Sequence, residues 1–212
     1  MELSELKSKT RRNIQKTKWY HGTTISGYQG IMDKGVKFDF SWGSELDFGP
    51  GFYLAPEKRM AEDFVKQQLS FKTSEGIEEF LSPDSLVPVV LEFEFSTMPY
   101  LERGELKILD VNDREFASFV TDNRIRAIEG LLHNYPLIYG IMSDNNPADL
   151  VSKFRDGELD KEEVIQGIMD RTISKRQLSI HTQDICDILK LTKAYVVDGG
   201  KELDINGYRN SN

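Results

Sequence analysis

The chain has 212 residues, of which 39% are hydrophobic, and this apolar content excludes a disordered chain. Its single cysteine, Cys186, excludes a disulfide scaffold and any cysteine-rich metal site. We find no run of about 18 uncharged apolar residues and no apolar stretch behind the first charges. We therefore expect a cytoplasmic protein with neither a membrane-spanning helix nor a secretory signal.

The net charge of −8 is unevenly distributed along the chain. Residues 1–18 carry six lysines and arginines against two glutamates, a net charge of +4, so the remainder carries −12. An acidic chain is a poor general ligand for nucleic acid, because lysine and arginine supply the phosphate contacts. The basic segment either contacts a polyanion or is a solvated helix, and both readings stay open.

Short strands and helices follow without regular βαβ alternation, which indicates an α+β fold. We divide the chain into a basic arm over 1–18, a domain over 19–198 and a polar tail over 199–212. In chain order, the patterns predict a strand over 18–21, a helix over 26–34, a strand over 51–55, a helix from Pro56, strands over 89–95 and 106–109, a helix over 113–132, a strand over 137–142, a helix from Asp160, a strand over 177–181, a helix over 182–189 and a strand over 193–198.

Several local details can be predicted as well. Ser26 is expected to cap the helix that Gly35 closes, and Asp160 with Glu163 is typical of a capping box. Alternation in 89–95 turns Glu92 and Glu94 outward, and we expect 106–109 to pair with this strand. The helices are expected to bury Ala61, Phe64, Val65 and Gln68 on one face, and Phe116, Phe119, Val120, Ala127, Ile128 and Leu131 on another.

The sequence does not support four familiar kinds of functional site. Histidines 21, 133 and 181 lack metal-ligand spacing, so no metal site is expected. The Asp47-Phe48-Gly49 triplet occurs without the other loops of a protein kinase. Gly49 and Gly51 precede a predicted strand, whereas the glycines of a dinucleotide-binding motif follow a strand and begin a helix. The segment is therefore not a dinucleotide-binding motif. Cys186 lies in an apolar helical run and is expected to be a buried, inert thiol.

Three short segments remain as site candidates. The histidine in Tyr20-His21-Gly22-Thr23 can bind ribose hydroxyls at a strand end, or merely cap a turn. In residues 47–54 (DFGPGFYL), two glycines clear space for a flat ring beside Phe52 and Tyr53, although Phe52 is more typical of a core. Residues 177–182 (QLSIHT) place Gln177 and Ser179 on one face of a strand, which is either a site or an exposed edge.

Together these segments resemble the His–Tyr–Glu signature of the ADP-ribosyltransferase superfamily, in its diphtheria-toxin and poly-ADP-ribose-polymerase branch. The resemblance is nearest to a bacterial family of that clan and spans residues 19 to about 191. Its motifs read Tyr-His-Gly-Ser/Thr, Asp-Phe-Gly-x-Gly-Phe-Tyr, Phe-Val-x-x-Asn-Arg and Gln-x-x-x-His-Thr, here at 20–23, 47–53, 119–124 and 177–182.

The resemblance implies a split mixed β-sheet with flanking helices, and NAD as a substrate. His21 matches the histidine that holds the ribose, Gly22 the backbone that clamps the nicotinamide amide, and Tyr53 the tyrosine on which nicotinamide stacks. Gln177 stands where the superfamily usually has its catalytic glutamate. The catalytic set is therefore His21, Tyr53 and Gln177, and the NAD-binding set is His21, Gly22, Thr23, Phe48, Gly51, Phe52 and Tyr53.

Glutamine changes the expected chemistry. It can accept a hydrogen bond from a ribose hydroxyl, but loss of the carboxylate is expected to slow the reaction about 10²–10³-fold. Asp47 or Asp144 can in principle supply the missing carboxylate. Arg124 is expected either to pair with the NAD pyrophosphate or, as we favour, to hold a structural carboxylate.

The resemblance favours an NAD-dependent ADP-ribosyltransferase, a glycosyltransferase of the bacterial or phage toxin or effector kind. An NAD glycohydrolase, a non-catalytic module that binds NAD or ADP-ribose, and a regulatory or immunity-type protein on the same fold remain alternatives. The acceptor, protein or nucleic acid, stays undetermined, as does an antitoxin partner, and no membrane partner is expected.

Overall fold

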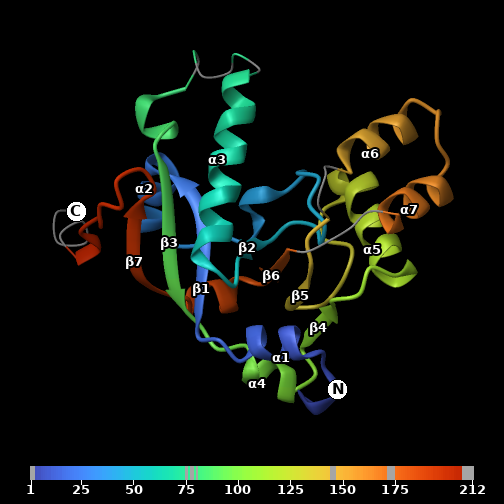
Figure 1. Ribbon diagram of the computed structural model, residues 1–212, viewed down its shortest axis with the longest axis horizontal. Helices are drawn as coiled ribbons and strands as arrows, with labels where there is room; N and C mark the ends of the chain where they lie inside the picture. Colours follow the sequence, from blue (N-terminus) through green and yellow to red (C-terminus); the bar gives the residue numbers. More distant parts are fainter. Residues whose placement is uncertain are drawn as a thin grey trace.

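The computed structural model describes residues 3–74, 76, 79, 81–143, 147–170 and 175–206. In these ranges the chain forms an α+β fold with two separate sheets (Figure 1). The three-stranded sheet has the order β1-β3-β7 and the four-stranded sheet the order β2-β6-β5-β4. The strands are β1 (Lys18–Thr24), β2 (Phe52–Leu54), β3 (Pro88–Glu94), β4 (Leu106–Leu109), β5 (Leu137–Ile141), β6 (Arg176–Ile180) and β7 (Lys190–Val196). The helices are α1 (Ser8–Ile14), α2 (Ile25–Lys34), α3 (Lys58–Ser74), α4 (Met98–Glu102), α5 (Arg114–Ile125), α6 (Ala148–Arg155), α7 (Lys161–Met169) and α8 (Gln183–Asp187).

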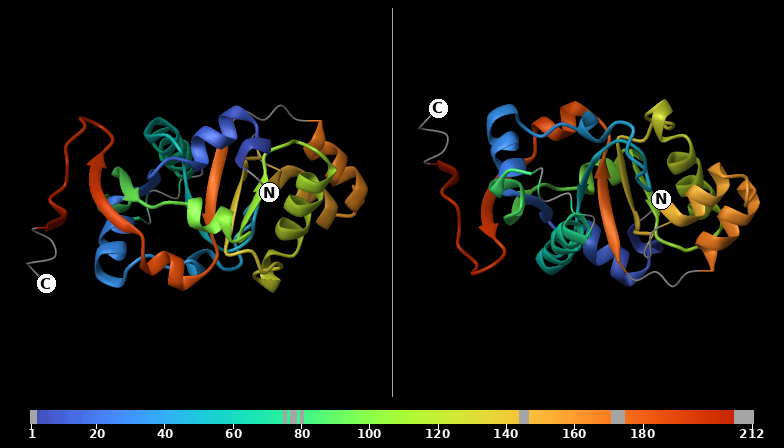
Figure 2. Two further views of the ribbon diagram at one scale, coloured as in Figure 1. Left: turned by 90° about the horizontal axis from the view of Figure 1, so that it is seen from below. Right: turned by 90° about the horizontal axis from the view of Figure 1, so that it is seen from above.

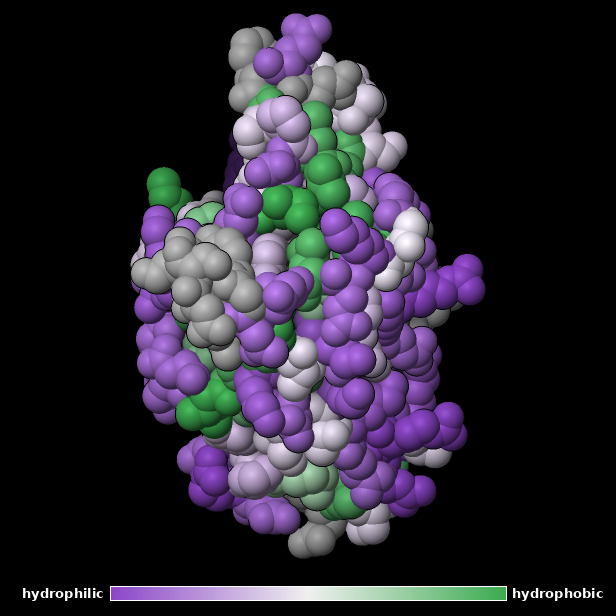
Figure 3. All heavy atoms as spheres, turned by 90° about the vertical axis from the view of Figure 1, so that its left-hand side faces the viewer, coloured by the Kyte–Doolittle hydropathy of each residue, from purple (hydrophilic) through white to green (hydrophobic). Residues whose placement is uncertain are grey.

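Two hydrophobic clusters hold the sheets in place. The larger cluster includes Trp19, Leu91 and Phe93, and fills the space between the two sheets. Helix α3 packs against the opposite face of β1 and β3. The second cluster, around Phe116 and Ile138, joins the four-stranded sheet to α5 and α7, which lie at the far end of the molecule (Figure 1). On the side of the molecule that carries β7, hydrophobic residues form only a narrow band among hydrophilic ones (Figure 3).

The basic segment folds onto this body. Ile14 of α1 is fully buried in the larger cluster, and Asn13 Nδ2 donates to Tyr139 Oη over 2.8 Å. The backbone oxygen of Ile14 also accepts a hydrogen bond from Thr97 Oγ1. Helix α1 lies against the body of the molecule in both views of Figure 2. Residues 1–18 therefore contain a helix with one buried side and one exposed side.

Several local predictions are confirmed. Gly35 ends α2 with a φ of 73°, and Asp160 and Glu163 form the predicted capping box at α7. Cys186 is buried, and burial raises the pKa of its thiol to about 12. The cap of α2 is Thr24 rather than Ser26, because β1 continues through Thr24, whose side chain accepts from the Gly27 amide over 3.3 Å. These features depend on neighbours in sequence, so local patterns identify most of them.

The predictions for β3 and β4 are partly wrong. Residues 106–109 pair with β5 in parallel, in the other sheet, because α4 carries the chain away from β3 before β4 begins. Glu92 is only 6% exposed although alternation turns it outward. It lies on the central strand of its sheet, where Lys18 Nζ from β1 at 3.1 Å and Thr192 Oγ1 from β7 at 3.1 Å enclose its carboxylate.

The predicted helix faces need correction too. The helix expected over 113–132 ends at Ile125, and Ile128 is 86% exposed. Gly130, with φ 86°, turns the chain against the Trp42 ring, which a Cβ at this position would meet at 2.0 Å. Helix α3 buries Ala61 and Val65 against β1 but leaves Phe64 39% exposed. Helix α6 was not predicted, because its apolar face of Leu150, Val151 and Phe154 spans only eight residues, too few to show a sustained helical period.

Candidate functional site

The site lies where the edge strands of the two sheets meet. Strand β1 touches β2 through one bridge, in which the Tyr20 amide donates to Ala55 O over 2.9 Å and the Ala55 amide donates to Tyr20 O over 2.7 Å. Backbone groups alternate sides along a strand, so the N–H and C=O of Gly22 face the same edge as those of Tyr20. No described residue hydrogen-bonds to Gly22 across this edge. A free donor and acceptor therefore stand side by side just beyond the bridge.

His21 projects from β1 toward the space between the sheets. Its Nδ1 lies 2.8 Å from the backbone oxygen of Tyr53, and its ring packs against Phe52 with 4.4 Å between centroids. A carbonyl oxygen only accepts, so Nδ1 carries the proton. Burial lowers the pKa of His21 below its ordinary value, which keeps the imidazole neutral near pH 7. The lone pair on Nε2 is consequently an acceptor.

Tyr53 is held by both its hydroxyl and its ring. Its hydroxyl donates to Gly49 O over 2.7 Å and accepts from the Phe48 amide over 3.1 Å. Its ring lies nearly parallel to that of fully buried Phe48, with an interplanar angle of 15°. Burial raises the pKa of Tyr53 well above its ordinary value, and the nearby Asp47 carboxylate adds to the rise. The tyrosine is therefore a neutral, fixed ring.

Asp47 is the centre of a buried polar network. Arg124 donates to it through Nε at 3.0 Å and Nη2 at 2.7 Å. Ser143 donates through its amide at 2.9 Å and through its hydroxyl, and Gln177 donates through Nε2 at 3.0 Å. Asp47 is 4% exposed, so its carboxylate is fully engaged and is not free to replace a catalytic glutamate. Arg124 has the structural role that the sequence favoured.

Gln177 reaches Asp47 from β6. Strand β2 pairs Tyr53 with Ser179, and Gln177 lies two residues from Ser179, so it shares the face of the sheet that carries the Tyr53 ring. Its Nε2 is committed to Asp47, and this bond fixes the amide orientation. Within the described ranges, Oε1 of Gln177 accepts no hydrogen bond. The glutamine therefore offers a neutral acceptor.

His133 and His181 contact backbone oxygens of the loop before β2. His133 Nε2 lies 2.9 Å from Phe48 O, and His181 Nδ1 lies 2.7 Å from Pro50 O. The second nitrogen of His181 contacts Ser179 Oγ at 2.7 Å, and the two imidazoles meet edge to face at 4.6 Å. Burial lowers the pKa of His133 and lowers that of His181 to about 3. Both imidazoles are therefore neutral and hold the loop through hydrogen bonds.

The remaining predicted site residues take supporting positions. Phe48 and Phe52 are 0% and 6% exposed, so they pack beneath the site. Gly51 leaves room for His181, whose Nδ1 a Cβ would meet at 2.8 Å, and the side chain of Thr23 packs beside Gly27. Asp144 lies outside the described residues. Sequence reasoning missed three residues that contact this loop from outside the predicted site segments: Ser41, His133 and Ser143. It quoted His181 as part of a motif but gave this residue no role.

Comparison of the sequence with models of known protein families identifies one family. The family described as "Protein of unknown function (DUF3990)" matches residues 19–191. The chain belongs to the DUF3990 family. No curated protein and no solved structure matches the chain. The DUF3990 match includes every site residue named above and begins after α1.

Two negative findings concern the described part of this DUF3990 protein. There, no group of three or more histidine, cysteine, aspartate or glutamate side chains is placed to hold a metal ion. None of the described helices combines the length and hydropathy needed to cross a lipid bilayer.

Gly22→Ala is expected to destabilise the fold, because the new Cβ would lie 2.3 Å from the backbone oxygen of Ala61 and 3.2 Å from Val65 Cβ. Overpacking of this kind lowers the free energy of unfolding by about 1–3 kcal/mol. Urea denaturation measures the loss. The matched control is Gly30→Ala on α2, where a Cβ meets nothing within 4 Å and helix propensity rises. Equal midpoints for Gly22→Ala and the wild type would contradict the close approach of α3.

His181 is expected to make the protein acid-sensitive. Its folded pKa of about 3 lies below the unfolded value of about 6.5, so its contribution is complete above pH 6.5 and is lost as the pH falls toward 3. Between pH 6.5 and 5 this loss amounts to about 2 kcal/mol. His181→Asn, less stable overall, should show a correspondingly shallower change in unfolding free energy with pH. Parallel pH profiles for the two proteins would contradict this, because they would show that His181 takes up its proton as readily in the folded state as in the unfolded state.

Gln177→Glu is expected to be destabilising at pH 8, because it places a second carboxylate where Gln177 Nε2 now lies 3.0 Å from Asp47 Oδ2. The like charge raises the pKa of the new glutamate, so stability is lost as the pH rises and recovers at pH 5. A buried unpaired charge costs about 3 kcal/mol. Gln166→Glu is the control, since Gln166 contacts Asp170 in the same way on an exposed helix face. Similar unfolding curves for both variants at pH 8 would contradict the buried contact.

Proposed function

We propose that the open edge between β1 and β2 binds NAD, and that the protein is an ADP-ribosyltransferase that releases nicotinamide and transfers ADP-ribose to a macromolecular acceptor. The observation that carries the proposal is the free N–H and C=O pair of Gly22, one residue after His21. A primary carboxamide, such as that of nicotinamide, has one donor and one acceptor side by side and is complementary to this pair.

The neighbouring groups suit the other parts of the same ligand. The His21 Nε2 lone pair can accept from a ribose hydroxyl, because Tyr53 O fixes the proton on Nδ1. The Tyr53 ring is half-buried and braced by Phe48, so it offers a rigid aromatic face for a pyridinium ring. These features support a site for a ribosyl-carboxamide rather than for a generic anion.

In the proposed reaction, the bond between the ribose C1′ and the pyridinium nitrogen breaks, and its electron pair leaves with neutral nicotinamide. The ribose passes through an oxocarbenium-like state, which the acceptor nucleophile attacks as it gives up its proton. Gln177 Oε1 would stabilise this state as a neutral dipole, and Asp47 would hold the amide in that orientation. A neutral group stabilises the cation less than a carboxylate, so we expect slow turnover, about 10²–10³-fold below a glutamate enzyme.

Gln177 also favours a second candidate, a module that binds NAD without breaking it. No described carboxylate near Tyr53 is free, because Asp47 is engaged by Arg124, Ser143 and Gln177. Binding through Gly22 and His21 needs no carboxylate, whereas cleavage benefits from one. Water as the acceptor would give an NAD glycohydrolase from the same residues.

Nicotinamide release from NAD by the purified protein, with and without cell lysate, tests the proposal. Tyr53→Ala should lower release at least tenfold, whereas Tyr53→Phe, which keeps the ring, should retain most of it. Tyr100→Ala is the control, since Tyr100 is a half-buried tyrosine on α4, away from the β1–β2 edge.

Release that requires lysate and labels a macromolecule supports a transferase, and release without lysate supports the glycohydrolase. NAD binding by calorimetry without release supports the binding module. Neither binding nor release, from a wild-type protein with normal unfolding behaviour, would overturn the proposal.

A further inference from the structure

The exposed side of α1 carries cations that lack acidic partners. Lys7, Arg11 and Arg12 are exposed, and none of the three contacts a carboxylate in the described part of the chain. Among the described residues, Lys16 Nζ has one hydrogen-bond partner, the backbone oxygen of Pro56 at 2.8 Å. The opposite side of α1 is buried in the body, so these charges are held outward on a fixed surface. We call Lys7, Arg11, Arg12 and Lys16 the basic surface.

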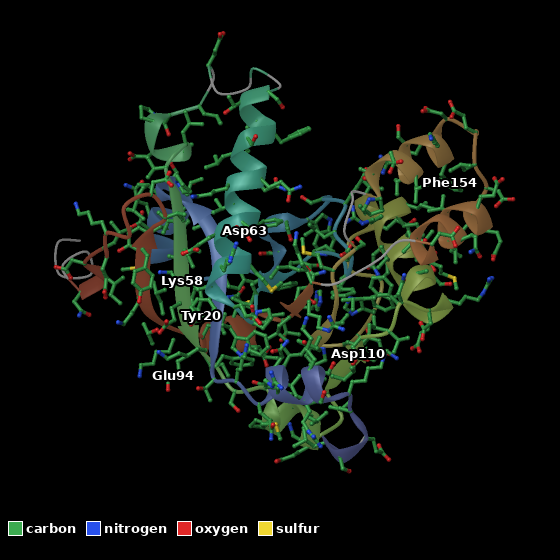
Figure 4. All side chains as sticks on the ribbon, in the orientation of Figure 1. Tyr20, Lys58, Asp63, Glu94, Asp110 and Phe154 are labelled. Carbon is green, nitrogen blue, oxygen red and sulfur yellow. The ribbon has the colours of Figure 1, made fainter. Side chains whose placement is uncertain are left out.

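A pocket of about 560 Å³ adjoins the basic surface. It lies between the end of the basic segment and the start of α3, and its walls include Lys16, Tyr20, Glu57 and Lys58. Tyr20 and Lys58 are labelled close together at the start of α3 in Figure 4. The pocket is shallow and mostly open to solvent, so it suits contact with one face of a ligand rather than its enclosure. An aromatic ring beside both donors and acceptors suits a nucleobase.

The positive charge available to a ligand belongs to the basic surface rather than to the pocket. Lys58 Nζ lies 3.7 Å from Glu62, and Lys18 Nζ, also at the pocket, lies 3.1 Å from Glu92, so both are largely neutralised. Residues 19–212 carry a net charge of −12, so the overall charge of the rest of the protein disfavours a polyanion.

We propose that the basic surface docks a polynucleotide, with its phosphates along Lys7, Arg11 and Arg12 and one nucleotide in the pocket beside Tyr20. Arginine guanidinium and lysine ammonium groups are the usual phosphate ligands in proteins. A lipid surface fits less well, because the exposed residues of α1 are serine, lysine and arginine, with no large apolar side chain to insert. Docking does not depend on the proposed transfer activity. If both hold, the polynucleotide is bound at the strand that also carries His21.

Fluorescence anisotropy with labelled single-stranded RNA and DNA 20-mers, without NAD, tests this docking between 50 and 200 mM salt. Each phosphate contact contributes about 0.7 to the slope of log affinity against log salt. With three contacts, the wild-type slope should therefore be about −2, and that of Lys7→Gln/Arg11→Gln/Arg12→Gln about 0, with affinity at least tenfold weaker at 50 mM. Tyr20→Ala should weaken binding about tenfold through lost stacking, with an unchanged slope.

The control is Lys34→Gln/Lys37→Gln/Lys201→Gln, which removes the same charge from the end of α2, the loop that follows it and the tail, and should bind like the wild type. Equal binding by the wild type and the basic-surface variant would overturn the proposal, as would an equal loss in the control. Binding of phosphatidylserine vesicles or of polyglutamate through Lys7, Arg11 and Arg12, without oligonucleotide binding, would also overturn it.

Discussion

The buried carboxylate of Asp47 is the constraint on which the site depends. An ionised group in a protein interior is tolerated only when hydrogen bonds and an opposite charge replace the water it loses. Arg124, Ser143 and Gln177 supply that replacement from α5, from the chain after β5 and from β6. The loop that begins at Asp47 is therefore fixed at its start, and the next residues place Tyr53.

The split between the sheets gives the site its unpaired backbone. Edge strands expose hydrogen-bonding groups that proteins usually cover or pair. Here β1 and β2 share a single bridge, and the chain leaves Gly22 open beyond it while α3 presses on the same residue from the other side. The absence of a Cβ permits the close approach of α3, and the amide and carbonyl of the same glycine have no described partner at the open edge.

Position 177 links the chemistry of the site to the stability of the fold. A glutamate there would face Asp47 at hydrogen-bond distance, and two carboxylates cannot both be ionised cheaply in a buried place. A glutamine satisfies Asp47 with its amide and leaves an oxygen available. The proposed activity is accordingly one that works with a neutral dipole, and the arginine on α5 is explained as the counter-charge of Asp47 rather than as a phosphate ligand.

The sequence alone determined features that depend on near neighbours: the α+β order of elements, the capping box at Asp160 and the motif segments around His21 and Tyr53. Periodicity and caps act within a few residues, so they are readable without the fold. Only the tertiary structure decided the pairing of β4 with β5, the burial of Glu92 and the partners of Asp47, one of which, Gln177, lies 130 residues away. Such contacts are set by how sheets and helices pack, and no local pattern encodes which distant side chain will neutralise a buried charge.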